Sequence, residues 1–512
     1  MKIVISLFLV AIIFDFDRII SLFKGIDNKA WTALLLIILS GFALRMWFVP
    51  HTHHVYFDEF EHVNIAQNFM SNGKFAVTDK GSAGSFEEYN FHKRPPAYYA
   101  FLALAFSVFG DTEQVAFNFS AVIGSLSILI VFLIGYLMFD NKGIALFSAF
   151  LFNLIPVHLR FSGSTQSEIT SLFLILLTLL AMFTYLRLQK KMSLFLLIST
   201  SALAIYARPE NGILLLLIPL SILLYKENLS KSKVETVQQI TIFLGATAFL
   251  LIPYIIHLYL VVFAYPAADY HDTLFTRLSY LKSHLPGNIL FWFSNAHPIL
   301  FTIFAIFGSM RMPKKHKRNA LFLLLWFFLF LILYSQYGYG DMLDSYNDDR
   351  YSLNLYISIV LLAAFGIREF IYLFKAKKII TMLVIAFISA GIYSPYSLKL
   401  NKSLTKDTQK EYQFILESKE ILPDDQYILS CNSSAIISSI RKKAMSPYIF
   451  VEMKEKPDNA ILFIDYWWYK NSPPGLNLVR KKLEEEYTFE TIKEKVISNE
   501  MRFSFVKLTK KK

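Results

Sequence analysis

The densest group of chemically active side chains lies in the stretch FDEFEH, residues 57–62, a few residues after the first long apolar segment. It contains two adjacent carboxylates, Asp58 and Glu59. The spacing i, i+3 and i+4 places Asp58, Glu61 and His62 on one face of a helix. Carboxylates gathered in this way can act as a general base or position a substrate. A solvated acidic helix face is the alternative interpretation.

A second motif, FHKRPP at 91–96, places Lys93 and Arg94 before a proline pair. A guanidinium group can hold phosphate oxygens through two parallel hydrogen bonds, so this pattern suits an anionic headgroup. Basic anchoring at a membrane surface is the alternative. The other candidates all lie at the ends of apolar segments: Glu168, Arg208, Glu210, Arg350 and Tyr351. Charges that border membrane segments are costly, which favours a function, although each could be a helix-end side chain reaching for water.

The stretch HTHH contributes three histidines, His51, His53 and His54, close to these carboxylates. Histidine and carboxylate ligands can hold a divalent metal. The alternative, which the sequence favours, is a set of polar residues at a membrane interface. The single cysteine, Cys431, excludes an intramolecular disulfide framework and a cysteine-based zinc site.

The composition indicates which elements must position these residues. Of the 512 residues, 55% are hydrophobic and 18% are charged, whereas soluble domains have about 45–50% and about 25%. The apolar residues form long runs, which indicates a polytopic membrane protein. The net charge of +12 comes mainly from short loops between these runs, so we expect no nucleic-acid partner.

About eleven apolar segments are predicted to cross the membrane: 31–49, 115–139, 143–161, 168–187, 192–207, 209–225, 238–263, 298–310, 319–336, 352–373 and 379–396. Every second connection is short and basic, and these are 140–143, 187–191, 226–233, 311–318 and 375–378. The positive-inside rule makes the basic set cytoplasmic. The candidate residues therefore face the outside of the plasma membrane, where the 264–297 loop could close over a bound ligand.

Two apolar stretches are not counted as crossings. Residues 95–110 are too short after the proline pair and are predicted to form a juxtamembrane helix. Residues 1–22 are interrupted by charges and form either an interfacial helix or an extra span. The predicted fold is therefore mainly α-helical, with a membrane domain at 1–396 that carries the outer catalytic loop 50–114. A small α/β domain outside the cytoplasm is predicted at 397–512.

Taken in order, these motifs resemble the GT-C superfamily of integral-membrane glycosyltransferases. The resemblance is to the branch that contains protein O-mannosyltransferases and the lipid A aminoarabinose transferase (glycosyltransferase family 39-like). It covers about residues 30 to 373 and rests on FDEFEHVNIAQNF, on HKRPPAYY, and on the later Glu168, Arg208-Pro209-Glu210 and Arg350-Tyr351. The stretch DYWWYK at 465–470 has similar letters to the oligosaccharyltransferase signature WWDYG in another order, and is interpreted as coincidence.

The resemblance implies transfer of a sugar from a polyprenyl phosphate (undecaprenyl or dolichyl) donor to a lipid, glycan or protein acceptor, usually with inversion. It implies Asp58 as the base with Glu59 in support, and donor-phosphate binding by Lys93, Arg94, Arg350 and Tyr351. The residues expected to position substrate are Glu61, His62, Glu168, Arg208 and Glu210. Lys93-Arg94 stands where aminoarabinose transferases have a Glu-Lys pair whose Glu helps to hold a metal. This departure argues against zinc, whereas a divalent metal stays an open alternative and no other cofactor is implied.

Two further functions stay open at this point. One is a transporter or flippase of a lipid-linked saccharide, although the sequence shows no internal repeat of the kind that such proteins usually carry. The other is a catalytically inactive relative that binds lipid or a partner.

Overall fold

The computed structural model describes residues 2–53, 56–77, 90–91, 95–225, 232–264, 273–294, 296–343, 348–377, 379–388, 391, 406–430, 434–465, 476–498 and 501–511. The chain divides into two compact units. The membrane unit comprises Met1–Thr52, Lys93–Tyr98 and Phe117–Leu400. The sheet unit comprises His53–His92, Tyr99–Ala116 and Asn401–Lys512.

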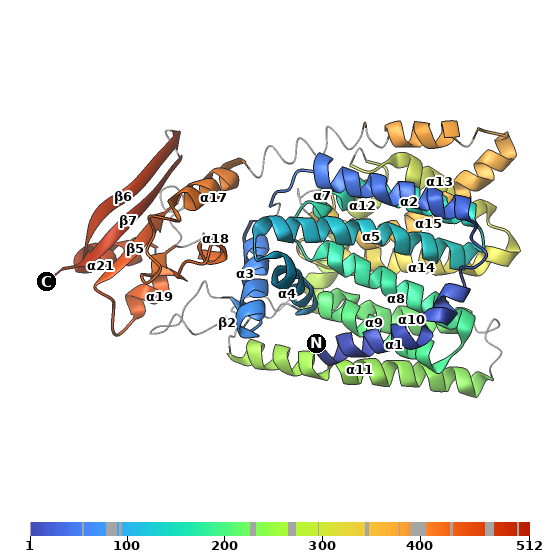
Figure 1. Cartoon of the computed structure of the whole chain (residues 1–512), viewed down its shortest axis with the longest axis horizontal. Helices are drawn as coiled ribbons and strands as arrows, with labels where there is room; N and C mark the ends of the chain where they lie inside the picture. Colours follow the sequence, from blue (N-terminus) through green and yellow to red (C-terminus); the bar gives the residue numbers. More distant parts are fainter. Residues whose placement is uncertain are drawn as a thin grey trace. The chain divides into compact units, whose positions relative to one another are not determined.

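The membrane unit is a bundle of apolar helices, most of which run side by side in Figure 1. Its elements are α1 (Lys2–Ser21), α2 (Asn28–Ala43), η1 (Leu44–Phe48), α5 (Glu113–Phe139, which begins in the sheet unit), α6 (Lys142–Asn153), α7 (Pro156–Ser162), α8 (Glu168–Leu188), α9 (Lys191–Ala207), η2 (Pro209–Ile213), α10 (Leu214–Leu224), α11 (Lys233–Ala264), α12 (Leu274–Phe291), α13 (Ile299–Arg311), η4 (Lys314–His316), α14 (Lys317–Tyr334), η5 (Asp348–Ser352) and α15 (Leu353–Phe374).

Six of the described helices are long and apolar enough to span a bilayer, and the bent pair α6–α7 makes a possible seventh span. The four remaining predicted crossings coincide with shorter apolar helices, at Lys191–Ala207, Pro209–Leu224, Ile299–Arg311 and Ile379–Ile388. The polytopic membrane fold is thus confirmed, whereas the number of eleven crossings stays a prediction. The N-terminal segment forms the single helix α1, which packs against α9.

A proline contributes to the bend of 61° between α6 and α7, and a buried arginine makes polar contacts with both helices. Pro156 opens α7 and cannot donate a backbone hydrogen bond to the end of α6. Arg45 lies fully buried on the π-helical turn η1 and donates to the Gly41 carbonyl and to the Asn153 side chain, both at 2.9 Å. Its Nη2 lies 2.7 Å from Nδ1 of His158 in α7. A buried arginine in a membrane span needs such partners, so Arg45 ties the first span to the bent pair.

Helices α13 and α15 cross closely at two glycines. A Cβ atom added to Gly308 would lie 2.2 Å from the Leu362 carbonyl oxygen, and one added to Gly366 would lie 2.0 Å from that of Phe304. Small residues let membrane helices approach backbone to backbone, where dispersion contacts replace the hydrophobic effect as the driving force.

The sheet unit combines most of residues 53–116 with the C-terminal residues. Its loop elements are α3 (Tyr56–Asn72), β1 (Ala76–Val77), β2 (Asn90–Phe91) and most of α4 (Ala97–Phe109), which begins in the membrane unit. The helix α4 confirms the helix predicted within residues 95–110. The C-terminal elements are α17 (Lys406–Ser418), β3 (Ile428–Leu429), α18 (Ser434–Ser439), β4 (Ala444–Met445), α19 (Pro447–Glu452), β5 (Asn459–Ile464), α21 (Leu476–Glu486), β6 (Tyr487–Ser498) and β7 (Met501–Lys510).

The five-stranded sheet has the order β4-β3-β5-β7-β6, in which β3 is parallel to β4 and β5, and the β5–β7 and β7–β6 pairs are antiparallel. Alternate residues of β5 fill two cores. Ile461 and Phe463 pack into the core that includes Phe414 of α17 and Phe60 of α3. Ala460 and Leu462 pack into the core on the other face. The small α/β region predicted at the C-terminal end of the chain is confirmed.

Two elements differ from the sequence expectations. The strand β6 is not among the sequence expectations, because charged residues at 490 and 493–495 interrupt its apolar pattern and it occupies an edge of the sheet. The loop expected at 264–297 contains the 18-residue helix α12, so this segment is not one long irregular loop, and its closure over a ligand stays a prediction. The helix α12 runs through Pro286 without ending.

Candidate active site

One group of charged side chains gathers where several membrane helices begin or end. Glu168 is the first residue of α8, and Arg208 follows the last residue of α9 in an extended conformation that Pro209 favours. Arg350 and Tyr351 lie on η5, immediately before α15. Helices α8 and α9 are packed together and joined by a short connection, so they run in opposite directions. The end of α9 therefore lies beside the start of α8. Chain topology therefore brings residues far apart in sequence to one end of the bundle.

The carboxylate of Glu168 lies at the centre of this group. Its Oε1 accepts a hydrogen bond from Arg208 Nη1 at 2.7 Å and lies 3.6 Å from Arg350 Nε. Arg208 also pairs with Glu210 through Nε. Asp348 lies 4.0 Å from Arg350 Nη2. The side chains of Glu168 and Glu210 are almost completely buried, so two guanidinium groups are held by carboxylates that solvent screens poorly.

An aromatic surface borders the two arginines. The guanidinium carbons of Arg350 and Arg208 lie 5.3 and 5.8 Å from the centre of the Tyr351 ring. Tyr351 itself packs against Tyr334 and Tyr337. Burial alone would lower the pKa of Arg208, but the charges of Glu210 and Glu168 raise it well above its ordinary value. Arg208 therefore keeps its positive charge.

A neighbouring ion pair was not predicted from the sequence. Arg160 of α7 pairs with Asp349 of η5, and both side chains are buried. Within the described part of the chain, Nε and Nη1 of Arg160 have no hydrogen-bond partner. The acidic pair directly before Arg350 was the signal available in the sequence, but the sequence separation of 189 residues between the two partners concealed their contact. The pair joins α7 to the turn that carries Arg350.

The helix predicted over the FDEFEH motif is α3, which ends at Asn72 before Gly73 in the left-handed region, with φ of 70°. Asp58 and Glu61 are half-buried on it, and Glu59 and His62 are buried. The His62 ring lies 5.5 Å from the Tyr99 ring. This places the predicted base, Asp58, at a more accessible position than its neighbour Glu59.

His53 links Glu59 to a residue that the sequence did not single out. Its Nδ1 lies 3.0 Å from Glu59, and its Nε2 contacts Glu113. Glu113 also accepts a hydrogen bond of 2.7 Å from the Tyr412 hydroxyl. Burial opposes a charge on His53, but hydrogen bonds to Glu113 and Glu59 outweigh it and raise the pKa to about 9. His53 is therefore a cation at neutral pH that fixes the orientation of Glu59.

Some predicted residues lie outside the described residues. These are the phosphate-binding candidates Lys93 and Arg94, together with His54, Cys431 and most of the DYWWYK stretch.

Comparison with known proteins identifies the fold of this chain. The chain has the fold of the GT-C glycosyltransferases, which confirms the resemblance seen in the sequence. Residues 93–260 match the family model described as dolichyl-phosphate-mannose-protein mannosyltransferase. ArnT from Cupriavidus metallidurans bound to undecaprenyl phosphate has a TM-score of 0.61 at 14% identity, and the match covers 94% of this chain and 98% of ArnT.

Two archaeal proteins are also similar. The oligosaccharyltransferase of Archaeoglobus fulgidus in its apo form has a TM-score of 0.59 at 12% identity, over 92% of this chain and 74% of that protein. The curated dolichyl-phosphooligosaccharide-protein glycotransferase 2 of the same organism is 28% identical over 170 residues. That match covers 30% of this chain and spans only 27% of the relative's length.

The Archaeoglobus oligosaccharyltransferase has been solved in complex with Zn and sulfate. The surroundings of His51 and His53 show whether these residues could hold a metal in this chain. Both ring nitrogens of His53 face carboxylates here, and Nε2 of His51 lies 3.0 Å from the Arg45 carbonyl oxygen. Among the described residues, no group of three or more histidine, cysteine or acidic side chains is arranged to hold a metal. These residues do not fit a metal, and no reaction step is assigned to one.

Proposed function

We propose that the protein is a glycosyltransferase that moves a sugar from a polyprenyl phosphate donor to an acceptor outside the cytoplasm, with inversion at the transferred carbon. The observation that carries this proposal is the pair Arg208 and Arg350, both held by Glu168 beside the face of Tyr351. Further support comes from the similar fold of ArnT bound to undecaprenyl phosphate and of an archaeal oligosaccharyltransferase with a dolichol-phosphate.

The arginine pair suits a leaving phosphate. When the bond between the sugar carbon and the phosphate oxygen breaks, the electron pair remains on the phosphate, which departs as a stable anion and needs no proton. Cations already in place stabilise this growing charge, by about 3–4 kcal/mol for one well-placed donor. Arg208 and Arg350 would repel each other alone, and the Glu168 carboxylate between them offsets that repulsion. Lys93 and Arg94 complete the proposed phosphate site.

The acceptor side of the reaction requires one base. As the acceptor oxygen forms its new bond to the sugar carbon, Asp58 takes the hydroxyl proton. Glu59, oriented by the protonated His53, supports the helix position rather than taking the proton, because its side chain is fully buried. Glu61 and His62 on the same helix, with Glu210 in the membrane unit, position the substrates. The apolar tail of the donor lies among the aromatic-rich membrane helices.

Substitution of the arginines tests the donor site. In the purified full-length protein, we expect Arg208→Gln and Arg350→Gln each to weaken binding of undecaprenyl phosphate by about tenfold or more, because each removes one charge-assisted contact to phosphate. Arg368→Gln is the matched control, since Arg368 lies exposed on α15 and pairs only with Glu369 among the described residues. Equal affinity of all three variants for undecaprenyl phosphate would contradict a role of the arginine pair in donor binding.

Glycosyl transfer itself separates the proposal from its two rivals. A flippase or an inactive lipid-binding relative would also bind polyprenyl phosphate, but neither would form a new glycosidic bond. Transfer of labelled sugar to any acceptor in membranes that contain this chain supports the enzyme and excludes both rivals.

A further inference from the structure

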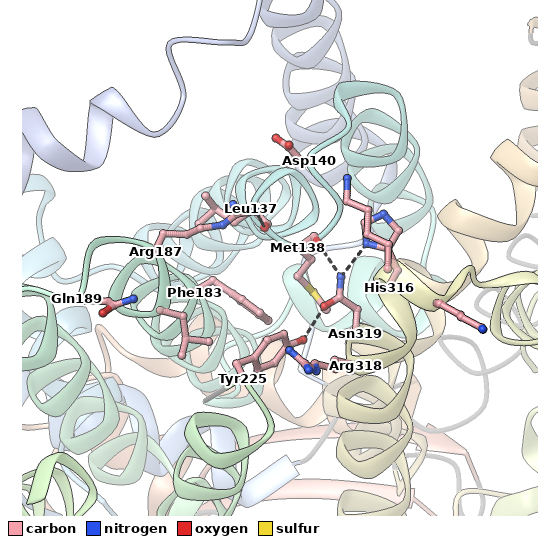
Figure 2. Close-up of a pocket in the computed structure, with 13 residues that line it drawn as sticks. Leu137, Met138, Asp140, Phe183, Arg187, Gln189, Tyr225, His316, Arg318 and Asn319 are labelled. Carbon is pink, nitrogen blue, oxygen red and sulfur yellow. Dashed lines mark hydrogen bonds between the residues drawn. The ribbon is translucent and has the colours of Figure 1, made fainter. Parts of the chain in front are cut away.

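A polar cavity lies at the end of the membrane helices opposite the arginine pair. Its volume is about 680 Å³, within the range of ordinary ligand pockets. It is formed where α5, α8 and α10 end and where η4 and α14 begin (Figure 2). Glu168 and Arg187 stand at opposite ends of α8, a helix of 21 residues, which separates this cavity from the arginine pair by about 30 Å.

Positive charge dominates the lining of this cavity. Four cationic side chains line it, and these are Arg187, Lys314, Lys315 and Arg318. Asp140 is the one carboxylate among the lining residues. Lys314 and Lys315 are exposed and form no ion pair with a carboxylate of the described residues. The excess of three positive charges, four cations less one carboxylate, favours an anion with more than one charge.

The floor of the cavity is held in place by hydrogen bonds across three helices. The amide of Asn319 in α14 accepts from the Tyr225 hydroxyl at 2.7 Å and donates to the Met138 carbonyl at 2.5 Å (Figure 2). Arg187 donates to the Leu137 carbonyl at 2.8 Å. These bonds satisfy the carbonyl groups at the end of α5, whose partial negative charge would otherwise oppose an anion. A preformed site loses little conformational entropy on binding.

The cavity also has an apolar side. Leu137, Met138, Phe183 and Leu186 line it together with the cations. Its cations belong to the basic connections that the positive-inside rule assigns to the cytoplasmic face. Anionic lipids are concentrated in that leaflet, and basic pockets between membrane helices accept their headgroups. The positive charge of the cavity, its apolar side and its predicted position at the cytoplasmic face all favour an anionic lipid headgroup.

We propose that this cavity is a binding site for a ligand carrying two phosphate charges, supplied by the headgroup of an anionic lipid of the inner leaflet. The apolar wall contacts the lipid chains next to the headgroup, and the four cations contact the phosphates. Inorganic pyrophosphate shares the charge but lacks the chains, so it distinguishes a lipid ligand from a soluble phosphate compound.

The test uses the purified full-length protein in detergent, with cardiolipin as the lipid probe and phosphatidylcholine as the neutral reference. We expect cardiolipin to bind and to raise the melting temperature. The double variant Lys314→Gln/Lys315→Gln should weaken cardiolipin binding by about tenfold or more, since each basic side chain near a lipid phosphate contributes about one kcal/mol. Asp140→Asn should tighten it, because it removes the opposing carboxylate and asparagine tolerates the positive φ of this position.

The matched control is Arg311→Gln/Lys317→Gln, which removes two charges from the same segment at exposed positions that do not line the cavity. It should change cardiolipin affinity by less than about twofold. Equal weakening by the two double variants would overturn the proposal, because general surface charge would then explain the binding. Absence of cardiolipin and pyrophosphate binding would also overturn it. Binding of pyrophosphate alone, sensitive to Lys314 and Lys315, would keep the phosphate site and contradict its lipid source.

Discussion

His53 connects two carboxylates of the sheet unit, Glu59 and Glu113, through its two ring nitrogens. Glu113 is held in turn by Tyr412, whose pKa is raised by burial and by the adjacent Glu113 charge. Tyr412 therefore stays a neutral donor. The charged histidine makes the buried carboxylate of Glu59 tolerable, because an isolated buried carboxylate is costly.

The pKa of His53 predicts a pH-dependent stability. Because the pKa is raised from 6.5 to about 9 in the folded protein, the stabilisation is complete below about pH 6.5 and is lost as the pH rises through 9. The full effect is about 3 kcal/mol. Thermal unfolding of the wild type and of His53→Gln between pH 6 and 10 measures it. The difference between the two melting temperatures should shrink across this window, and a constant difference would contradict the assignment.

The candidate site could be anticipated from sequence only in part. Glu168, Arg208 and Arg350 each flank an apolar run, and alternating topology places such ends on one side, so their proximity follows from the pattern of runs. Glu113 and Asp349 were not singled out. Their partners lie 60 and 189 residues away, and no local spacing carries that information.

Helix packing at the α13–α15 crossing gives a prediction about elements. Gly366→Ala should destabilise the protein by about 1–3 kcal/mol, because the added methyl group would meet the Phe304 carbonyl at 2.0 Å and force the two backbones apart. Gly245→Ala in α11 is the control, because its added methyl group meets no atom within 4 Å. That change should be neutral or stabilising, since alanine favours a helix. Melting temperatures in detergent compare the two variants, and equal effects would contradict the account of the crossing.

At the level of elements, long apolar runs were the dependable signal. They predicted the positions of the membrane helices because a bilayer demands continuous apolar length. Long apolar runs could not indicate β6, an edge strand interrupted by charged residues, or α12, whose polar composition lacks an apolar run. Both elements are stabilised by partners elsewhere in the chain rather than by their own composition.

The orientation of the whole molecule follows from its basic connections and can be tested by thiol labelling. In a Cys431→Ser background, which removes the one natural cysteine, we expect Asp425→Cys to react with a membrane-impermeant maleimide in intact cells. Lys315→Cys should react only after permeabilisation. Both positions are exposed, so access alone does not distinguish them. The opposite labelling pattern would place the C-terminal residues and the candidate active site on the cytoplasmic side.

The central claim for the whole molecule is that it forms a glycosidic bond with Asp58 as the base. The most direct measurement is transfer from a radiolabelled polyprenyl phosphate sugar in membranes that contain the wild type, Asp58→Asn or the exposed control Asp425→Asn. We predict transfer by the wild type and the control, and a loss of at least about 100-fold in Asp58→Asn at unchanged protein abundance and melting temperature, because the amide cannot take the acceptor proton. Transfer at the wild-type rate by Asp58→Asn would contradict the assignment of the base.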